Sequence, residues 1–509
     1  MNTNTQTLGQ KLIFGSSYSY FSLVVNKAIG IVTAIFLARF LGPENLGIIS
    51  IINYLLVLLL FFTGLGIPTA CVKLIAEYNL KEKTKVSEFI LAAFAFNFII
   101  IIIITLLYYF AASYLAINIY RETKLIELIQ LSALALFFFS LNQYLNSVIQ
   151  AFAEFGRLSL ISIFNSVFGL IAMIIFTKLF GLKGPVLSQA IASIATFLLI
   201  IKTMLFLKGK YSLSLQIIKY NIKNLYGNLK QYFRKLLSLT LPVFLSGLVM
   251  IPVLPVLTTL LTRLRGFTEV GFFNVAYSLT QIILFVPTAV GMAFIPLATK
   301  LAAEDRNRLN DFLLKTIYGV MIIVMILSFL LSFFSNTIIN LFFSAKFIPS
   351  QNILLLLSAA TFLSSFGYLV GYYLLAINKM WFALLMNLIW CIIIVTPAFF
   401  LIKFLGLVGL GLDYLIAYSF LTTIFVIYLK NGLKIVVKRL VLYLAIGVFI
   451  PIAVFILKLL TAPLGYYIIL FIIFLVFISI LLPKTINKKL IKELIGDKFN
   501  RSYYKNASN

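Results

Sequence analysis

Lys27 is the residue whose type and position first indicate chemistry. It lies in the middle of a long apolar stretch, where an amine is costly unless it meets an anion or a partner. Small and polar residues recur beside it at helical spacing, namely Gly15, Ser19, Ser22, Asn26, Gly30 and Thr33. Such a face is too polar for lipid. We therefore predict that Lys27 and Asn26 line a polar cavity in which Lys27 meets an anion; an internally paired, structural lysine is the alternative.

Amide side chains form two further polar stripes. Asn142, Asn146 and Gln150 fall on one face of a helix expected over 125–150. Asn274 and Gln281, with Ser278 between them, recur in a helix expected over 270–297. Amides in hydrocarbon seek partners, so these stripes either join helices or line a cavity. The sequence leaves both readings open.

Asp413 is a carboxylic acid inside another apolar stretch, 406–429. It is a candidate for binding a coupling proton or Na⁺, and the alternative is that it neutralises a neighbouring cation. The chain contains no histidine, which excludes histidine metal sites, histidine proton relays and Ser-His triads. We expect no metal or cofactor beyond such a coupling ion.

Composition defines the elements that must position these residues. The 509 residues are 62% hydrophobic and only 11% charged, against roughly 45–50% and about 25% in soluble proteins. The chain is therefore expected to be an all-α polytopic membrane protein of the cell membrane. Segments of about 20 apolar residues predict fourteen spans: 12–38, 46–70, 88–113, 125–150, 158–180, 184–206, 236–262, 270–297, 312–335, 351–376, 380–402, 406–429, 439–460 and 464–482.

The distribution of Lys and Arg predicts the orientation of these spans. With fourteen spans, basic residues favour the side that holds both termini by about three to one. Because basic residues gather on the cytoplasmic side, both termini are predicted to lie inside. The same bias explains the net charge of +27, so a nucleic-acid partner is not needed and membrane lipids are the expected surroundings.

A short motif recurs in the two halves of the chain. "ARFLGPENLGII" (38–49) aligns with "TRLRGFTEVGFF" (262–273), so that Arg39, Gly42 and Gly47 match Arg263, Gly266 and Gly271. A second block, 66–83, resembles 294–308 in the same order. Six spans separate the copies, which predicts a parallel repeat of two six-helix lobes, with a substrate site between them and alternating access.

The repeat divides the chain into four segments. Residues 1–206 form an N-lobe and 236–430 a C-lobe, while 431–509 contain two appended spans and a basic cytoplasmic tail. The intervening residues 207–235 alternate apolar and basic side chains near helical spacing. This pattern favours an amphipathic helix on the inner leaflet over a plain basic loop.

Arg39, Arg263 and Arg265 lie at the outer ends of helices. They are expected to pair with Glu44 and Glu269 and so shape the outer turns, or to form an outer gate or an exit contact for the substrate. Arg265 replaces an apolar residue of the first copy and breaks the symmetry of the repeat. It is therefore the stronger functional candidate of the three.

The repeated segments also resemble a known family. "RFLGPENLGIISIINYLLVLLLFFTGLGIPTACVKLIAEYN" is similar to the start of polysaccharide-transporter (Wzx, O-antigen flippase) proteins, and "FFNVAYSLTQIILFVPTAVGMAFIPLATKLAAEDR" resembles their second-lobe segment. These proteins belong to the MOP superfamily, with the MATE exporters and the lipid II flippase MurJ. The resemblance is specific at 39–77 and 263–306 and extends to the rest of the chain only in hydropathy and span count.

The resemblance implies a flippase rather than an enzyme. Its substrate would be an oligosaccharide on a polyprenyl phosphate or pyrophosphate, moved without ATP hydrolysis, with glycan-assembly enzymes as possible partners. Lys27 would then meet the phosphate, and the amides the sugar hydroxyls. A cation-coupled MATE-like exporter is the alternative, although it would favour acidic cavity residues and typically twelve spans. A membrane glycosyltransferase or polymerase is disfavoured because the expected outer loops are short.

Overall fold

The computed structural model describes residues 8–81, 83–211, 236, 240–241, 244–432 and 438–461, with scattered positions between 463 and 474. All regular secondary structure in these residues is helical, which confirms the all-α class. The amphipathic helix expected in the 207–235 linker falls almost wholly outside the described residues, as do most of the span at 464–482 and the basic tail. Those expectations stay predictions.

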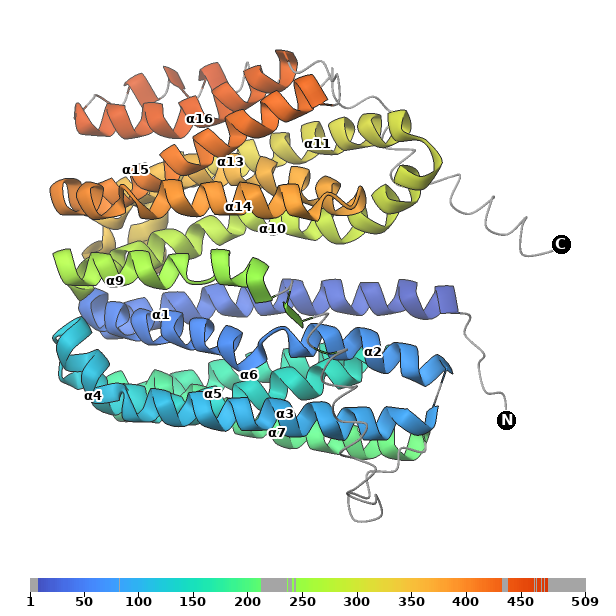
Figure 1. Cartoon of the computed structure of the whole chain (residues 1–509). Coiled ribbons are helices and arrows are strands. Elements are labelled where there is room, and N and C mark those ends of the chain that lie inside the picture. The colour runs from blue at the N-terminus through green and yellow to red at the C-terminus, as the bar shows by residue number, and fades with distance from the viewer. Residues whose placement is uncertain are drawn as a thin grey trace. The chain divides into compact units, whose positions relative to one another are not determined.

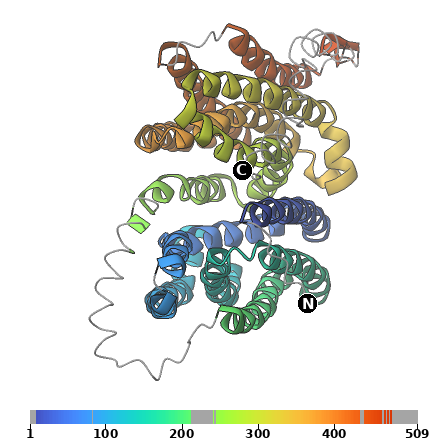
Figure 2. The same cartoon turned by 90° about the vertical axis from the view of Figure 1, so that its right-hand side faces the viewer.

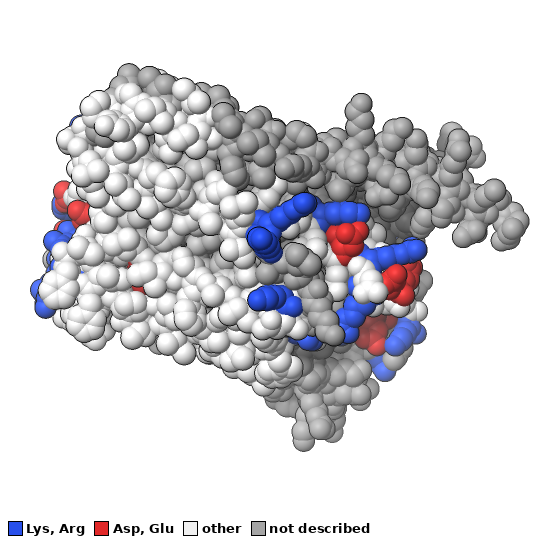
Figure 3. Space-filling view, turned by 90° about the horizontal axis from the view of Figure 1, so that it is seen from above, with Lys and Arg blue, Asp and Glu red and all other residues white. Residues whose placement is uncertain are grey.

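Within the described ranges, ten helical stretches are long and apolar enough to cross a membrane. Two of them, Tyr18–Gly64 and Phe155–Lys210, each cover two of the spans expected from the sequence. On the face drawn in Figure 3, Lys and Arg gather at the two ends, and uncharged residues fill the broad band between them. The protein is therefore a multi-pass membrane protein, while the number fourteen and the orientation remain predictions.

The first of two compact units contains the N-terminal helices and two later segments. It spans Met1–Val275, Phe342–Phe347 and Val395–Gly409. Its helices are α1 (Leu8–Gly64), α2 (Ile67–Lys81), α3 (Lys83–Phe110), α4 (Ala112–Tyr114), the π-helix η1 (Leu115–Tyr120), α5 (Lys124–Ala151), α6 (Phe155–Phe180), the 3-10 helix η2 (Gly181–Lys183), α7 (Gly184–Tyr211), α9 (Val253–Arg265) and the 3-10 helix η5 (Ala345–Phe347). In Figure 1 the long helices from α1 to α7 run side by side, and Figure 2 shows the same bundle turned towards its ends.

Helix α5 is central to the packing of the first unit. It contacts α1, α2, α3 and α7. Its Tyr144 is fully buried with Cys71 of α2 and Phe89 of α3 in one apolar cluster, and the Tyr144 hydroxyl donates to the Ile90 carbonyl at 2.6 Å. Lipid is as apolar as this cluster, so close packing and such interhelical hydrogen bonds hold the bundle together.

The second unit is also entirely helical in its described part. It spans Ala276–Leu341, Ile348–Ile394 and Leu410–Asn509. Its helices are α10 (Phe267–Glu304) and α15 (Ala398–Ile427), whose first turns belong to the first unit, the π-helix η4 (Ile339–Phe343), whose last two residues also belong to the first unit, α11 (Arg306–Phe333), α12 (Ser335–Ile338), α13 (Ser350–Ala376), α14 (Met380–Val395), the π-helix η6 (Tyr428–Gly432) and α16 (Lys438–Leu459). Helix α13 packs against both α11 and α16, which also contact each other.

The motif recognised in the sequence adopts the same backbone in both copies. Gly42 has φ 75° and ψ 177°, and Gly266 has φ 92° and ψ 175°. Both values lie where glycine is favoured, so each glycine breaks the helical path at the same point of its copy. The parallel repeat is thus visible in the backbone as well as in the residue types.

The second matched glycine of each copy makes a reciprocal contact within the first unit. A Cβ atom at Gly47 would lie 1.9 Å from the carbonyl oxygen of Phe267, and one at Gly271 would lie 2.0 Å from that of Pro43. Pro43 and Phe267 are themselves equivalent in the alignment. Helix α1 and the start of α10 therefore touch backbone to backbone about a local pseudo-twofold axis, which only residues without a side chain permit.

The structure extends the repeat beyond the segments that the sequence matched. The π-helices η1 and η4 occupy equivalent places, about 225 residues apart. Gly181 (φ 55°, ψ −123°) and Gly406 (φ 60°, ψ −134°) break the chain in the same way at the same spacing. The duplication thus extends at least from the first motif to Gly181 in one copy and to Gly406 in the other.

The reciprocal glycine contact predicts a loss of stability on substitution. Gly47→Ala or Gly271→Ala should lower the thermal unfolding temperature of the purified protein in detergent, because overpacking costs about 1–3 kcal/mol. Gly30→Ala is the control, since no atom lies within 4 Å of its Cβ position. Equal unfolding temperatures for the three variants and the wild type would contradict the contact.

Candidate functional site

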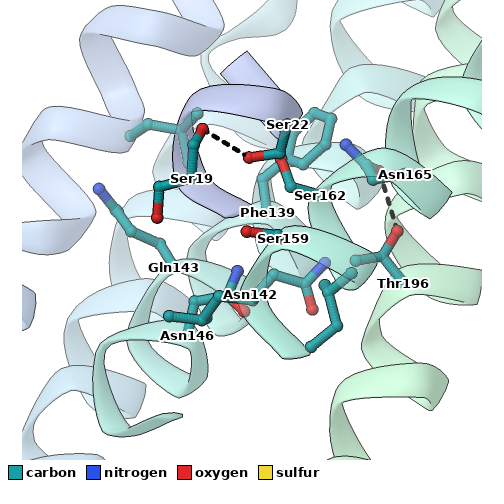
Figure 4. Close-up of a pocket in the computed structure, with 13 residues that line it drawn as sticks. Ser19, Ser22, Phe139, Asn142, Gln143, Asn146, Ser159, Ser162, Asn165 and Thr196 are labelled. Carbon is teal, nitrogen blue, oxygen red and sulfur yellow. Dashed lines mark hydrogen bonds between the residues drawn. The ribbon is translucent and has the colours of Figure 1, made fainter. Parts of the chain in front are cut away.

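The amide stripe of α5 forms one wall of a cavity within the first unit. Asn142 and Asn146, with their neighbour Gln143, line a space of about 580 Å³. Figure 4 shows these side chains from α5 facing those of α1 and α6. The four-residue spacing places Asn142 and Asn146 on one helical face, as the sequence predicts, and Gln150 follows one turn later.

Hydroxyls and amides from three other helices complete the polar lining. These residues are Ser19 and Ser22 of α1, Ser159, Ser162 and Asn165 of α6, and Thr196 of α7. The Ser22 hydroxyl donates to the Ser19 carbonyl at 3.0 Å, and the Thr196 hydroxyl to Asn165 Oδ1 at 2.8 Å (Figure 4). In the part of the chain that the structure describes, the lining of this cavity contains no ionisable side chain. The cavity is therefore polar and neutral.

Two acceptors in this lining lack a donor. Asn142 Nδ2 donates to the Ser193 carbonyl at 2.9 Å, but its Oδ1 and that of Asn146 have no hydrogen-bond partner among the described residues. Buried polar groups are normally paired, and an orphan costs about 1–3 kcal/mol. These two oxygens consequently retain hydrogen-bonding capacity that the described residues do not use.

Other polar groups near this cavity are paired across helices. The Thr63 and Ser140 hydroxyls share a hydrogen bond of 2.8 Å, and Asn97 Nδ2 donates to the Thr63 carbonyl at 2.8 Å. Both bonds join helices and leave their groups satisfied. The lining of the cavity thus differs from the polar contacts that hold the bundle together.

Apolar side chains cover part of the same cavity. Leu60 of α1, Phe139 of α5 and Leu158 of α6 lie among the polar residues. A pocket that combines an aromatic face with a few polar groups binds ligands by burial and orients them by hydrogen bonds. The arrangement suits a neutral ligand with hydroxyls at its edge and an apolar face.

A second cavity adjoins the first along α5. It measures about 510 Å³ and shares Gln143, Asn146 and Leu158 with its neighbour. Gln150 and Ser147 of α5 and residues of α2 complete it, including Lys73. We call the two adjoining cavities together the α5 groove; among the described residues its lining is neutral in the first cavity and includes one cation in the second.

Asn26 and Lys27, which the sequence predicted to line one cavity together, have different surroundings in the structure. Asn26 Nδ2 donates to the Ser162 hydroxyl at 2.6 Å, and its Oδ1 accepts from Ser166 at 2.8 Å. Asn26 thus joins α1 to α6 by two hydrogen bonds, and one of its partners, Ser162, lines the first cavity. Lys27 is exposed, and no partner for its amine lies among the described residues.

Arg39 and Arg263 make equivalent, exchanged contacts. Arg39 Nε donates to the carbonyl of Phe342 at 2.7 Å, and Arg263 Nη2 donates to that of Asn118 at 3.0 Å. Asn118 belongs to η1 of the first copy and Phe342 to η4 of the second. Each arginine therefore binds the π-helix of the other copy, which is a structural role compatible with a gate.

Arg265 is also engaged by backbone oxygens. Its Nε donates to the Ile402 carbonyl at 3.2 Å and its Nη2 to that of Lys403 at 2.7 Å. The guanidinium lies against Gly406, where a Cβ atom would be 3.4 Å from Nε. Arg265 thus caps the broken first part of α15, and its role towards a substrate stays a prediction.

The remaining amide candidates of α10 lie in different units. Asn274 Nδ2 donates to the Tyr54 hydroxyl of α1 at 3.1 Å and joins two helices of the first unit. Gln281 belongs to the second unit, and its Nε2 is buried without a partner in the described part of the chain. Neither residue lines the groove of α5.

Asp413 is fully buried in α15 of the second unit. Both carboxyl oxygens lack a hydrogen-bond partner among the described residues. Its equivalent in the first copy is Ser188, whose hydroxyl donates to the Pro185 carbonyl at 2.7 Å. An unpaired carboxylate in this position would cost several kcal/mol, so the group requires a proton or a cation.

Sequence reasoning missed several residues of the groove. Ser159, Ser162 and Asn165 recur at helical spacing within the span predicted at 158–180, and that stripe was a usable signal. Lys73 lies just beyond the span predicted at 46–70, where nothing in the sequence marked it as part of a cavity. Only the fold shows that Lys73 of α2 lines the second cavity.

Similarity to solved structures defines the class of the protein. The fold matches the lipid II flippase MurJ in an inward closed conformation with a TM-score of 0.69, 18% identity, and coverage of 95% of this chain and 100% of that one. It matches an inward-facing MATE family multidrug transporter with a TM-score of 0.67 and 16% identity, over 78% of this chain and 92% of the other. The chain thus has the fold of MOP superfamily transporters.

The chain belongs to the polysaccharide biosynthesis protein family, whose model matches residues 13–302. A curated relative is stage V sporulation protein B of Bacillus subtilis (strain 168), which is 23% identical over 232 residues. That match spans 43% of this chain and 43% of the relative. The resemblance read from the sequence is confirmed at the level of family and superfamily.

Asn146 has an unpaired side-chain oxygen, whereas both side-chain atoms of Asn26 are paired, so substitutions at the two positions should affect stability differently. Asn146→Ala should leave the unfolding temperature nearly unchanged, because its Oδ1 accepts no hydrogen bond from the described residues, but should weaken ligand binding. Asn26→Ala should lower the unfolding temperature, because it leaves Ser162 and Ser166 unpaired; the expected cost is about 1–3 kcal/mol. Thermal unfolding of both variants measures the difference. The reverse order of stability would show that the groove is a packing feature.

Proposed function

We propose that this protein is a flippase that moves lipid-linked oligosaccharides across the cytoplasmic membrane. One observation carries the proposal: a membrane-embedded bundle contains a neutral cavity lined by amides, hydroxyls and an aromatic ring. Sugars present hydroxyls at their edges and apolar ring faces, so their chemistry is complementary to that lining. Family membership and the MurJ-like fold support the same function.

In this proposal the sugar occupies the groove while the lipid tail stays in the bilayer. Asn142 and Asn146 offer unpaired acceptors to sugar hydroxyls, and Phe139 offers a face to the ring. Transport proceeds by alternating access between the two repeat copies. It uses no ATP and feeds the assembly of surface polysaccharide or another exported glycan.

A MATE-like exporter of cationic drugs is the competing function. The fold allows it, since MATE transporters share the architecture. The lining of the two cavities favours sugar, because no carboxylate is among its described residues to attract a cation. The two functions are separated by the substrate that the reconstituted protein moves.

Reconstituted liposomes test the proposal directly. The purified protein should translocate a fluorescent sugar on an isoprenyl pyrophosphate, measured as loss of accessibility to an external quencher or glycosidase. A cationic dye should not be moved faster than through empty liposomes. Movement of the dye and not of the lipid-linked sugar would overturn the proposal in favour of an exporter.

Lys27 provides a variant for the same assay. Lys27 lines neither cavity, but its amine is exposed and has no partner among the described residues, so it is available to the anionic part of a substrate that enters or leaves the groove. Lys27→Ala should reduce translocation at least tenfold while the protein stays folded and membrane-inserted; the exposed Lys178→Ala is the control. Full activity of Lys27→Ala would remove this residue from the substrate path.

We further propose that Asp413 couples transport to a proton or Na⁺ gradient. Its buried, unpartnered carboxyl group is stable only when neutralised. Asp413→Asn should therefore abolish gradient-driven accumulation and retain equilibrative exchange of substrate. Asp311→Asn, which affects a carboxylate that pairs with Lys315 at 2.8 Å, is the control. Unchanged gradient dependence in Asp413→Asn would place coupling elsewhere.

A further inference from the structure

The second cavity of the α5 groove has a chemistry that the neutral cavity lacks. Its lining contains Pro68, Thr69, Val72 and Lys73 of α2, Gln143, Asn146, Ser147 and Gln150 of α5, and Leu158 of α6. Lys73 is the ionisable member of this set. The groove therefore offers one positive charge, at one end, within the described residues. A ligand with a neutral part and an anionic part would bind in one orientation.

Lys73 is available because of a difference between the two repeat copies. Lys73 and Glu77 match Lys300 and Glu304 in the alignment. In the second copy, Lys300 Nζ lies 3.8 Å from Glu304 Oε1. In the first copy, the equivalent glutamate is 3.0 Å from Lys81 instead. No partner for the Lys73 amine lies among the described residues.

The surroundings of Lys73 suit an oxyanion. Thr69 contributes a hydroxyl and Gln150 an amide to the same lining, and both side chains can donate hydrogen bonds. Pro68 and Thr69 lie in the first turn of α2, which begins after Leu65 and Gly66 at positive φ. The positive end of the helix dipole adds to the charge of the lysine there. The chemistry is that of a phosphate group rather than of a sugar.

We propose that Lys73, with Thr69 and Gln150, binds the phosphate or pyrophosphate that joins the sugar to its lipid. This inference rests on the proposed flippase function and assigns the orientation of the substrate in the groove. The anionic linkage lies at the α2 end, and the uncharged sugar extends past Asn146 towards Ser19 and Ser22. The second cavity thus binds the charged linkage of the substrate, and the first cavity binds the sugar hydroxyls.

Binding of three probes to the full chain in nanodiscs tests this assignment. The first probe is N-acetylglucosamine on a short isoprenyl pyrophosphate. The second is the same sugar joined to the same isoprenol without phosphate, and the third is the isoprenyl glycoside of glucuronic acid, which has a carboxylate but no phosphate. Lys73→Gln should weaken the first probe about ten- to a hundredfold, because a charged hydrogen bond is lost, and leave the second unchanged.

Two control variants separate charge from structure. Lys73→Arg should retain most of the affinity for the pyrophosphate probe, and Lys300→Gln, which alters the equivalent lysine of the second copy, should retain all of it. Thr69→Val should weaken the same probe by a smaller factor. Thermal unfolding of each variant, which should match the wild type for the exposed Lys73, shows that the change in affinity is local.

The remaining outcomes overturn one statement or both. If Lys73→Gln weakened binding of the first two probes equally, the lysine would only shape the cavity. If it weakened binding of the glucuronide alone, Lys73 would bind acidic sugars instead of phosphate. Full binding of the pyrophosphate probe by Lys73→Gln would overturn the inference while the flippase proposal stands. A wild-type protein that binds none of the probes would overturn both.

Discussion

The need to satisfy polar groups in hydrocarbon is the constraint on which this structure depends. A membrane bundle has no water to accept or donate a hydrogen bond in its core, so unpaired groups are costly. The first unit meets this demand across its helices, for example between Thr63 and Ser140 and between Asn26 and Ser162. The oxygens of Asn142 and Asn146 are among the buried groups that this network leaves without a partner in the described residues. They border a cavity, and a ligand with hydroxyl groups would satisfy them.

The positions that the two repeat copies share hold the backbone together, and the positions at which they differ contain the candidate functional groups. Glycines at equivalent positions bend the chain in the same way and let the two copies touch through their backbones. Arg39 and Arg263 exchange contacts with each other's π-helices. The candidate functional groups are the positions at which the copies differ. Asp413 takes the place of a satisfied serine, and Lys73 lacks the glutamate partner that Lys300 retains.

Much of the fold could be predicted from the sequence, because long apolar runs and repeated glycines carry strong signals. The all-α class, the position of the spans and the repeat follow from them, and the stripe of Asn142, Asn146 and Gln150 was visible from its spacing. The opposite walls of the groove could not be predicted in the same way. Which helix faces α5 depends on tertiary packing, so the spacing of the α6 serines could indicate a polar face but not its partner, and nothing marked Lys73 as part of the same site. The pairing of Asn26 and the capping by Arg265 depend equally on contacts between distant segments.

A structure of the protein in nanodiscs with a bound sugar on a short isoprenyl pyrophosphate tests the central claim most directly. We expect density for the sugar between α5 and α6, within hydrogen-bond distance of Asn142 and Asn146 and beside Phe139. In a second structure, with an isoprenyl pyrophosphate that carries no sugar, this part of the groove should lack that density. A sugar bound with both amides still unpaired, or held entirely by residues outside the α5 groove, would contradict the account.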